Sequence, residues 1–140
     1  MDKIAEQYVK MVLELGLYDP NYVDFYIGPN EWKPVDETRE ADFPYRRFKE
    51  NADRLLGDLE ELKDSIDNSE EKQRYKYLQK QIRAAATNVE LLAGKEIAFD
   101  EQSSLVYDAI NPEYPDGFFD EIYDDLNHIL PGSGSLNARF

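Results

Sequence analysis

Two long stretches of the sequence repeat apolar residues in alternating steps of four and three, the spacing that places side chains on one face of a helix. The first stretch spans residues 42 to 66 and the second spans residues 68 to 93. The repeated positions are Phe48, Ala52, Leu55, Leu59, Leu62 and Ile66, then Tyr75, Leu78, Ile82, Ala85, Val89 and Leu92. The short link of residues 67 to 70 favours an antiparallel helical hairpin, because that arrangement buries both stripes against each other.

Shorter helices are predicted on the N-terminal side of these stretches. Residues 2 to 15 carry apolar side chains on one helical face, and Gly16 is typical of a left-handed helix cap. Asp19 and Pro20 form a start signal for a short helix that ends before Gly28. The residues of that short helix expected to face inward are Val23, Tyr26 and Ile27.

Further helices are predicted after the second stretch. One runs from about residue 100 to residue 110, and another begins at Pro115. The inner face of this second helix is expected to consist of Phe119, Ile122, Leu126 and Ile129. Ser135 is a good N-cap for a last helix that runs toward Phe140. Because no segment reads convincingly as a strand, we predict an all-α fold, a helical bundle built on the long hairpin with shorter flanking helices.

The acidic composition limits the classes of partner. The chain has 140 residues, a net charge of −14 and 41% hydrophobic residues, which is enough for one packed domain over residues 1–140. Nucleic-acid binding needs clustered cations, and an anionic membrane surface repels an acidic chain, so neither partner is expected. The sequence has no secretory signal and no apolar run of membrane length, so the cytoplasm is the expected location.

Histidine and cysteine usage argues against catalysis by this chain. The sequence has no cysteine and one histidine, His128, which is expected to lie at a helix end on the surface. A zinc site of the usual type cannot be built from that set, so we expect no catalytic and no metal-binding residue here. Asp116, Asp120 and Asp124 stand four apart and could line a site for Mg²⁺ or Ca²⁺, but a solvated acidic face is the favoured interpretation.

Charges are segregated along the chain. Residues 72 to 83 contain five basic side chains and no acid, whereas residues 96 to 125 contain ten acids and no base. These two groups either face each other within the fold or lie on separate solvated faces. Separate faces are favoured, because surface ion pairs contribute little.

The segment from residue 18 to residue 32, YDPNYVDFYIGPNEW, is rich in aromatic residues although Pro, Gly and Asn interrupt it. Tyrosine rings can be buried while their hydroxyls stay hydrogen-bonded, so packing over the hairpin explains them. Alternatively, four residues of the segment form a wall that contacts a ligand or another domain. These candidate site residues are Tyr22, Asp24, Tyr26 and Trp32.

The order of these features resembles the amino-terminal region of a family of uncharacterised bacterial proteins expected to be zinc metallopeptidases. The resemblance rests on IAEQYVKMVLELG, YDPNYVDFYIGPNEW, YLQKQIRAAATNVELLAGKEIAFDEQSSLVYDA and LPGSGSLNARF, and it covers nearly the whole chain. In that family the zinc motif, His-Glu-x-x-Pro-Gly-His, lies beyond the region that matches. This sequence does not contain the motif.

The resemblance implies that this chain is the non-catalytic N-terminal helical domain of a longer metallopeptidase or hydrolase. Its partner would be the remainder of its own chain, and the zinc would belong to that catalytic region. The chain by itself would then expose apolar surface, including Leu136 and Phe140, and we expect it to self-associate when salt screens its charge. The alternative is a self-standing helical module that binds another protein.

Overall fold

The computed structural model describes residues 1–35 and 39–140. Within these residues the chain forms six α-helices and no strand, so the all-α prediction is confirmed. The helices are α1 (Asp2–Leu15), α2 (Tyr45–Glu61), α3 (Ser69–Leu92), α4 (Phe99–Tyr107), α5 (Phe118–Ile129) and α6 (Leu136–Arg139). Short 3-10 helices, η1 (Asn30–Trp32) and η3 (Lys63–Ser65), precede and follow α2.

The chain divides into two compact units, Met1–Ile110 and Asn111–Phe140. Each unit is described by itself. The first contains α1 to α4 and the buried core, and the second contains α5 and α6. The sequence-based expectation of one domain over residues 1–140 stays a prediction.

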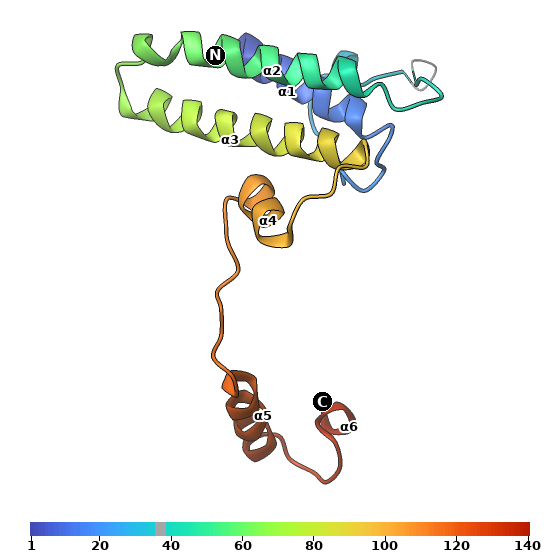
Figure 1. The fold of residues 1–140 in the computed structure, drawn as a ribbon, viewed down its shortest axis with the longest axis vertical. Helices are drawn as coiled ribbons and strands as arrows, with labels where there is room; N and C mark the ends of the chain where they lie inside the picture. The colour runs from blue at the N-terminus through green and yellow to red at the C-terminus, as the bar shows by residue number, and fades with distance from the viewer. Residues whose placement is uncertain (36–38) are drawn as a thin grey trace. The chain divides into compact units, whose positions relative to one another are not determined.

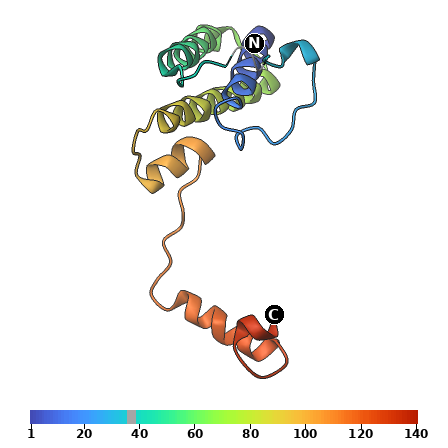
Figure 2. The same cartoon turned by 90° about the vertical axis from the view of Figure 1, so that its right-hand side faces the viewer.

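The core of the first unit lies between α1, α2 and α3. Figure 1 shows α2 and α3 side by side with the chain reversing direction between them, and Figure 2 shows α1 next to both. Of the twelve stripe positions, Leu62 and Leu92 are half-buried and the others are buried, as their spacing predicted. The helix α1 contributes Ile4, Met11 and Leu15 to the same core.

Local signals explain the ends of α3. The side chain of Asn68 accepts a hydrogen bond from the backbone N–H of Glu71 at 2.8 Å, which caps the first turn. Just past the other end, Gly94 has a φ of 86°, a left-handed conformation that glycine adopts without steric cost. Apart from these end signals, the Tyr75 hydroxyl of α3 donates a 2.7 Å hydrogen bond to the Glu60 carboxylate, which links α3 to the last turn of α2.

Two predictions for the N-terminal region are wrong. Gly16 was predicted to be a left-handed cap, but its backbone has the right-handed helical conformation, with a φ of −57°. The chain after α1 continues in right-handed turns, so no left-handed residue is needed there. No helix forms over residues 20–27. Instead, Asp19 accepts hydrogen bonds from the N–H of Asn21 at its side chain and of Tyr22 at its carbonyl, so a local turn replaces the predicted helix start.

The C-terminal helices also differ from expectation. The helix α4 ends at Tyr107 rather than near residue 110, because Asp108 turns into a left-handed conformation with a φ of 56°. The helix α5 forms, but its predicted inner face is exposed, including Phe119 at 56% and Ile129 at 74%. Periodicity therefore located this face correctly without establishing that anything covers it.

Gly57 lies inside α2, on the exposed side of the helix. A Cβ atom at this position would meet nothing within 4 Å. We expect Gly57→Ala to raise the free energy of unfolding by about 0.5 to 1 kcal/mol, because alanine loses less backbone freedom on folding into a helix. Urea denaturation followed by circular dichroism would measure this change. An unchanged or lower midpoint would contradict the placement of Gly57 inside an exposed helix.

Candidate functional site

Tyr18 anchors the start of the aromatic segment, defined as residues 18–35. Its ring makes edge contacts with Phe43 and Phe48 at centroid distances of 5.3 and 5.8 Å. Its hydroxyl accepts a 3.0 Å hydrogen bond from the backbone N–H of Glu40. Because Phe48 is a core residue, this aromatic cluster fixes the segment to the N-terminal end of α2.

Tyr22, the first candidate residue, packs inward beside Tyr8 of α1. Burial raises the pKa of Tyr22 to about 12, and the neighbouring Asp19 adds to this increase. Burial also raises the pKa of Tyr8, and the nearby hydroxyls of Tyr22 and Tyr77 contribute. The Tyr8 hydroxyl donates a 3.2 Å hydrogen bond to Gln81 of α3. Tyr22 therefore belongs to a tyrosine cluster that joins the segment to α1 and α3.

Tyr26 and Trp32 are half-buried and both lie near Lys10 of α1. The Lys10 ammonium is 5.6 Å from the centre of the Trp32 ring. The pKa of Tyr26 is raised, by desolvation first and then by Glu31, while the positive charge of Lys10 opposes the increase. Asp24, the remaining candidate, is exposed. The structure thus brings Tyr26 and Trp32 to one side of α1 and leaves Asp24 in solvent.

The middle of the segment carries two exposed apolar residues that the sequence analysis did not choose as site residues. Phe25 is 80% exposed and Ile27 is 89% exposed. Ile27 was expected to face inward from a helix, and that prediction is wrong because residues 20–27 form no helix. Because the neighbouring residues anchor the segment, these two exposed apolar side chains are candidates for contact with another surface.

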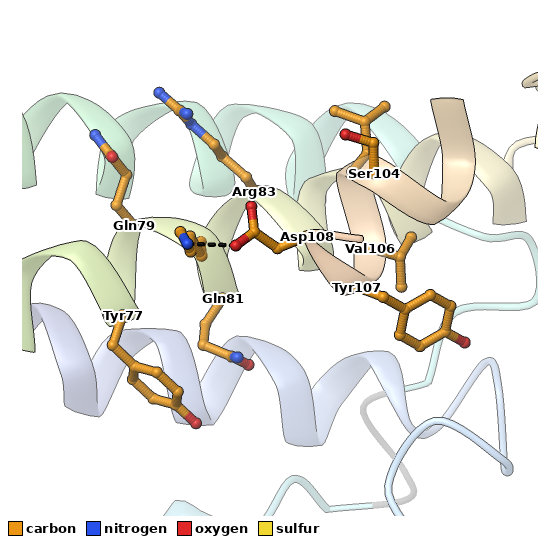
Figure 3. Close-up of a pocket in the computed structure, with 10 residues that line it drawn as sticks. Tyr77, Gln79, Gln81, Arg83, Ser104, Val106, Tyr107 and Asp108 are labelled. Carbon is orange, nitrogen blue, oxygen red and sulfur yellow. Dashed lines mark hydrogen bonds and ion pairs between the residues drawn. The ribbon is translucent and has the colours of Figure 1, made fainter. Parts of the chain in front are cut away.

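A second candidate region is an open pocket between α3 and α4, with a volume of about 430 Å³. Figure 3 shows Asp108 reaching toward α3, where an ion pair joins it to Lys80. The pocket walls combine aromatic, amide and hydroxyl groups with one further cation. The residues that line it are Tyr77, Gln79, Lys80, Gln81, Arg83, Ser104, Leu105, Val106, Tyr107 and Asp108.

This pocket can offer hydrogen bonds, but its residues include neither histidine nor cysteine. Ser104 has no imidazole partner there, and the carboxylate of Asp108 is paired with a lysine. The sequence analysis missed the pocket, because no motif marks it. The sequence offered one signal for it. Asp108 belongs to the acidic residues 96 to 125 and Lys80 to the basic residues 72 to 83, so the two side chains could be expected to attract each other.

The basic residues 72 to 83 form ion pairs with two different parts of the first unit. Lys80 of the basic run pairs with Asp108 of the acidic segment, so these two groups do face each other at one point. Arg74 instead pairs with Asp2 of α1 at 2.5 Å. Both pairs are exposed, so each contributes little to stability.

His128 is exposed, and its Nδ1 lies 2.7 Å from the backbone oxygen of Asp124 on the same helix. Over residues 1–35 and 39–140, no group of three histidine or acidic side chains is placed to hold a metal ion. Over the same residues, no helix has both the length and the apolar character needed to cross a membrane.

Comparison of the chain with protein-family models, with curated proteins and with solved structures gives no match. The resemblance to zinc metallopeptidases therefore stays a hypothesis.

Proposed function

We propose that this chain is a non-catalytic helical domain whose aromatic segment packs on, or borders, the catalytic cleft of a zinc-dependent metallopeptidase or hydrolase. The observation that carries the proposal is the exposed pair Phe25 and Ile27 on a segment held to the core by Tyr18 and Tyr22. Apolar anchors that are already positioned lose little conformational entropy on binding, which favours docking against another domain.

Two further features support a role without chemistry. One histidine and no cysteine cannot form a zinc site of the usual type, so zinc would belong to the catalytic region. Within the tyrosine cluster, the Tyr8 hydroxyl is engaged in a structural hydrogen bond to Gln81. The cytoplasmic location expected from the sequence stays a prediction.

The first test is whether the source reading frame continues past Phe140 into a His-Glu-x-x-Pro-Gly-His motif. If it does, the polypeptide encoded beyond residue 140 should bind this chain, and Trp32 fluorescence should report the contact. We expect Phe25→Ser with Ile27→Ser to weaken binding at least tenfold, because buried apolar anchors dominate interfaces.

Phe99→Ser is the matched control, because Phe99 is also an exposed phenylalanine but lies at the start of α4. It should leave the affinity unchanged. The proposal would be contradicted if the reading frame lacked the motif. It would also be contradicted if Phe99→Ser weakened the binding as much as the Phe25→Ser and Ile27→Ser variant does.

A self-standing interaction module is the second candidate. It is favoured by the first unit having a core made entirely from its own helices α1, α2 and α3, with Ile66 just beyond α2. Under this alternative the reading frame carries no zinc motif, and the surface around Phe25 binds a separate protein.

A further inference from the structure

The unit Asn111–Phe140 leaves the apolar face of its main helix exposed along its whole length. The exposed apolar residues of α5 are Phe119, Ile122, Tyr123, Leu126 and Ile129. At the start of the helix, Phe118 stacks on Tyr114 with ring centres 4.5 Å apart. Phe119 makes edge contacts with both rings at 5.3 and 5.4 Å. One end of the face is thus an aromatic cluster held by mutual packing.

The other end of the face is a groove built by α6. Gly132 and Gly134 have φ values of 108° and 115°, and these left-handed residues turn the chain back toward α5. The Arg139 guanidinium then donates hydrogen bonds to the backbone oxygens of Asn127 and Leu130 at 3.2 and 3.1 Å. A cation at the C-terminal end of a helix is stabilising there, so Arg139 holds α6 in place.

The groove between α5 and α6 has a volume of about 380 Å³. Its walls are mostly apolar, and Tyr123 and Asn137 are the lining residues with polar groups on their side chains. The residues that line it are Tyr123, Leu126, Leu130, Leu136, Asn137 and Phe140. Within residues 111–140, no other segment fills it. The aromatic cluster, the face and the groove together form one apolar surface, called here the α5 surface.

Acidic residues border the α5 surface. Glu121 and Asp125, four residues apart, follow one edge of the apolar face, and Asp120 lies at the other edge, whereas Asp124 lies on the opposite side of the helix. Arg139 is the only Lys or Arg in residues 111–140, and the end of α5 already engages it. Residues 111–140 therefore hold no free cation to match this rim, and a bound helix that carries Lys or Arg would complement it.

We propose that the α5 surface binds a cationic amphipathic helix, with one apolar face flanked by Lys or Arg residues. Such a helix would lay its apolar face into the groove and its cations against the rim. A second copy of this chain fits less well, because it would bring the same acidic rim to the interface. An anionic membrane is disfavoured by the same charge.

The test uses the full chain and two labelled model helices of equal length and apolar face, one with Lys and one with Glu on its polar face. Fluorescence anisotropy should show saturable binding of the Lys helix that weakens as salt increases, and no binding of the Glu helix. Equal binding of both helices would overturn the proposal, because charge complementarity would then play no part.

Paired variants separate the rim from the overall negative charge of the chain. Asp125→Asn and Asp124→Asn change the net charge equally, but only Asp125 borders the apolar face. We expect Asp125→Asn to weaken binding of the Lys helix about two- to fivefold and Asp124→Asn to have no effect. Equal effects would show attraction by net charge alone and would overturn the proposal.

Leu126→Ser tests the groove itself. It should weaken binding of the Lys helix at least tenfold while circular dichroism shows unchanged helix content.

Sedimentation of the free chain at low and moderate salt tests whether a second copy of the chain occupies the groove instead. A dimer at either salt concentration that Leu126→Ser dissociates would assign the groove to another copy of this chain and overturn the proposal.

Discussion

Replacing Leu59 or Ile82 by alanine should lower the free energy of unfolding by about 2 to 5 kcal/mol. Both side chains are fully buried, Leu59 in α2 and Ile82 in α3. The change removes apolar contacts and leaves a cavity that the surrounding helices can fill only in part, because the packed core relaxes incompletely. Neither change creates an unsatisfied polar group, so the loss measures packing alone.

Urea denaturation followed by circular dichroism would measure this loss. Leu105→Ala makes the same change at an exposed position of α4 and should cost less than about 1 kcal/mol. A loss below about 0.5 kcal/mol at both buried positions would mean that the stripes of α2 and α3 do not form the stability core.

Raising the pH from 10 toward 12 should lower the free energy of unfolding through Tyr22. Its pKa is about 12 in the folded protein, mainly because of burial, against an ordinary value of 10.0. The unfolded chain therefore loses this proton first. The stability that comes from the neutral hydroxyl is complete below pH 10 and is lost as the pH rises through 12, amounting to about 2 to 3 kcal/mol.

The Tyr22→Phe variant removes the titrating hydroxyl, so its stability should fall less steeply between pH 10 and pH 12. Other groups titrate in the same range, and Tyr107→Phe, at an exposed position of α4, controls for them. Urea midpoints at several pH values, read by circular dichroism, give the slopes. Equal slopes for Tyr22→Phe and the unaltered chain would show that Tyr22 is not buried.

The tertiary contacts of the aromatic segment could not be derived from its sequence. Asp19 and Pro20 carry a helix start signal, yet the backbone turns, since Asp19 satisfies the next N–H groups itself. The place of Tyr18 depends on Phe43 and Phe48, which are distant in sequence. Of the four residues chosen as candidates, only Asp24 is exposed, whereas the exposed residues Phe25 and Ile27 were missed.

The sequence by itself determined the two long helices, the apolar stripe on each and the ends of α3. Apolar residues at steps of three and four must share a helix face, and signals such as Asn68 and Gly94 act within one turn, so local physics decides them. The tertiary structure alone decided which faces are covered. The stripe of α3 is buried by α1 and α2, whereas the equally regular face of α5 is exposed, because burial depends on what distant segments supply.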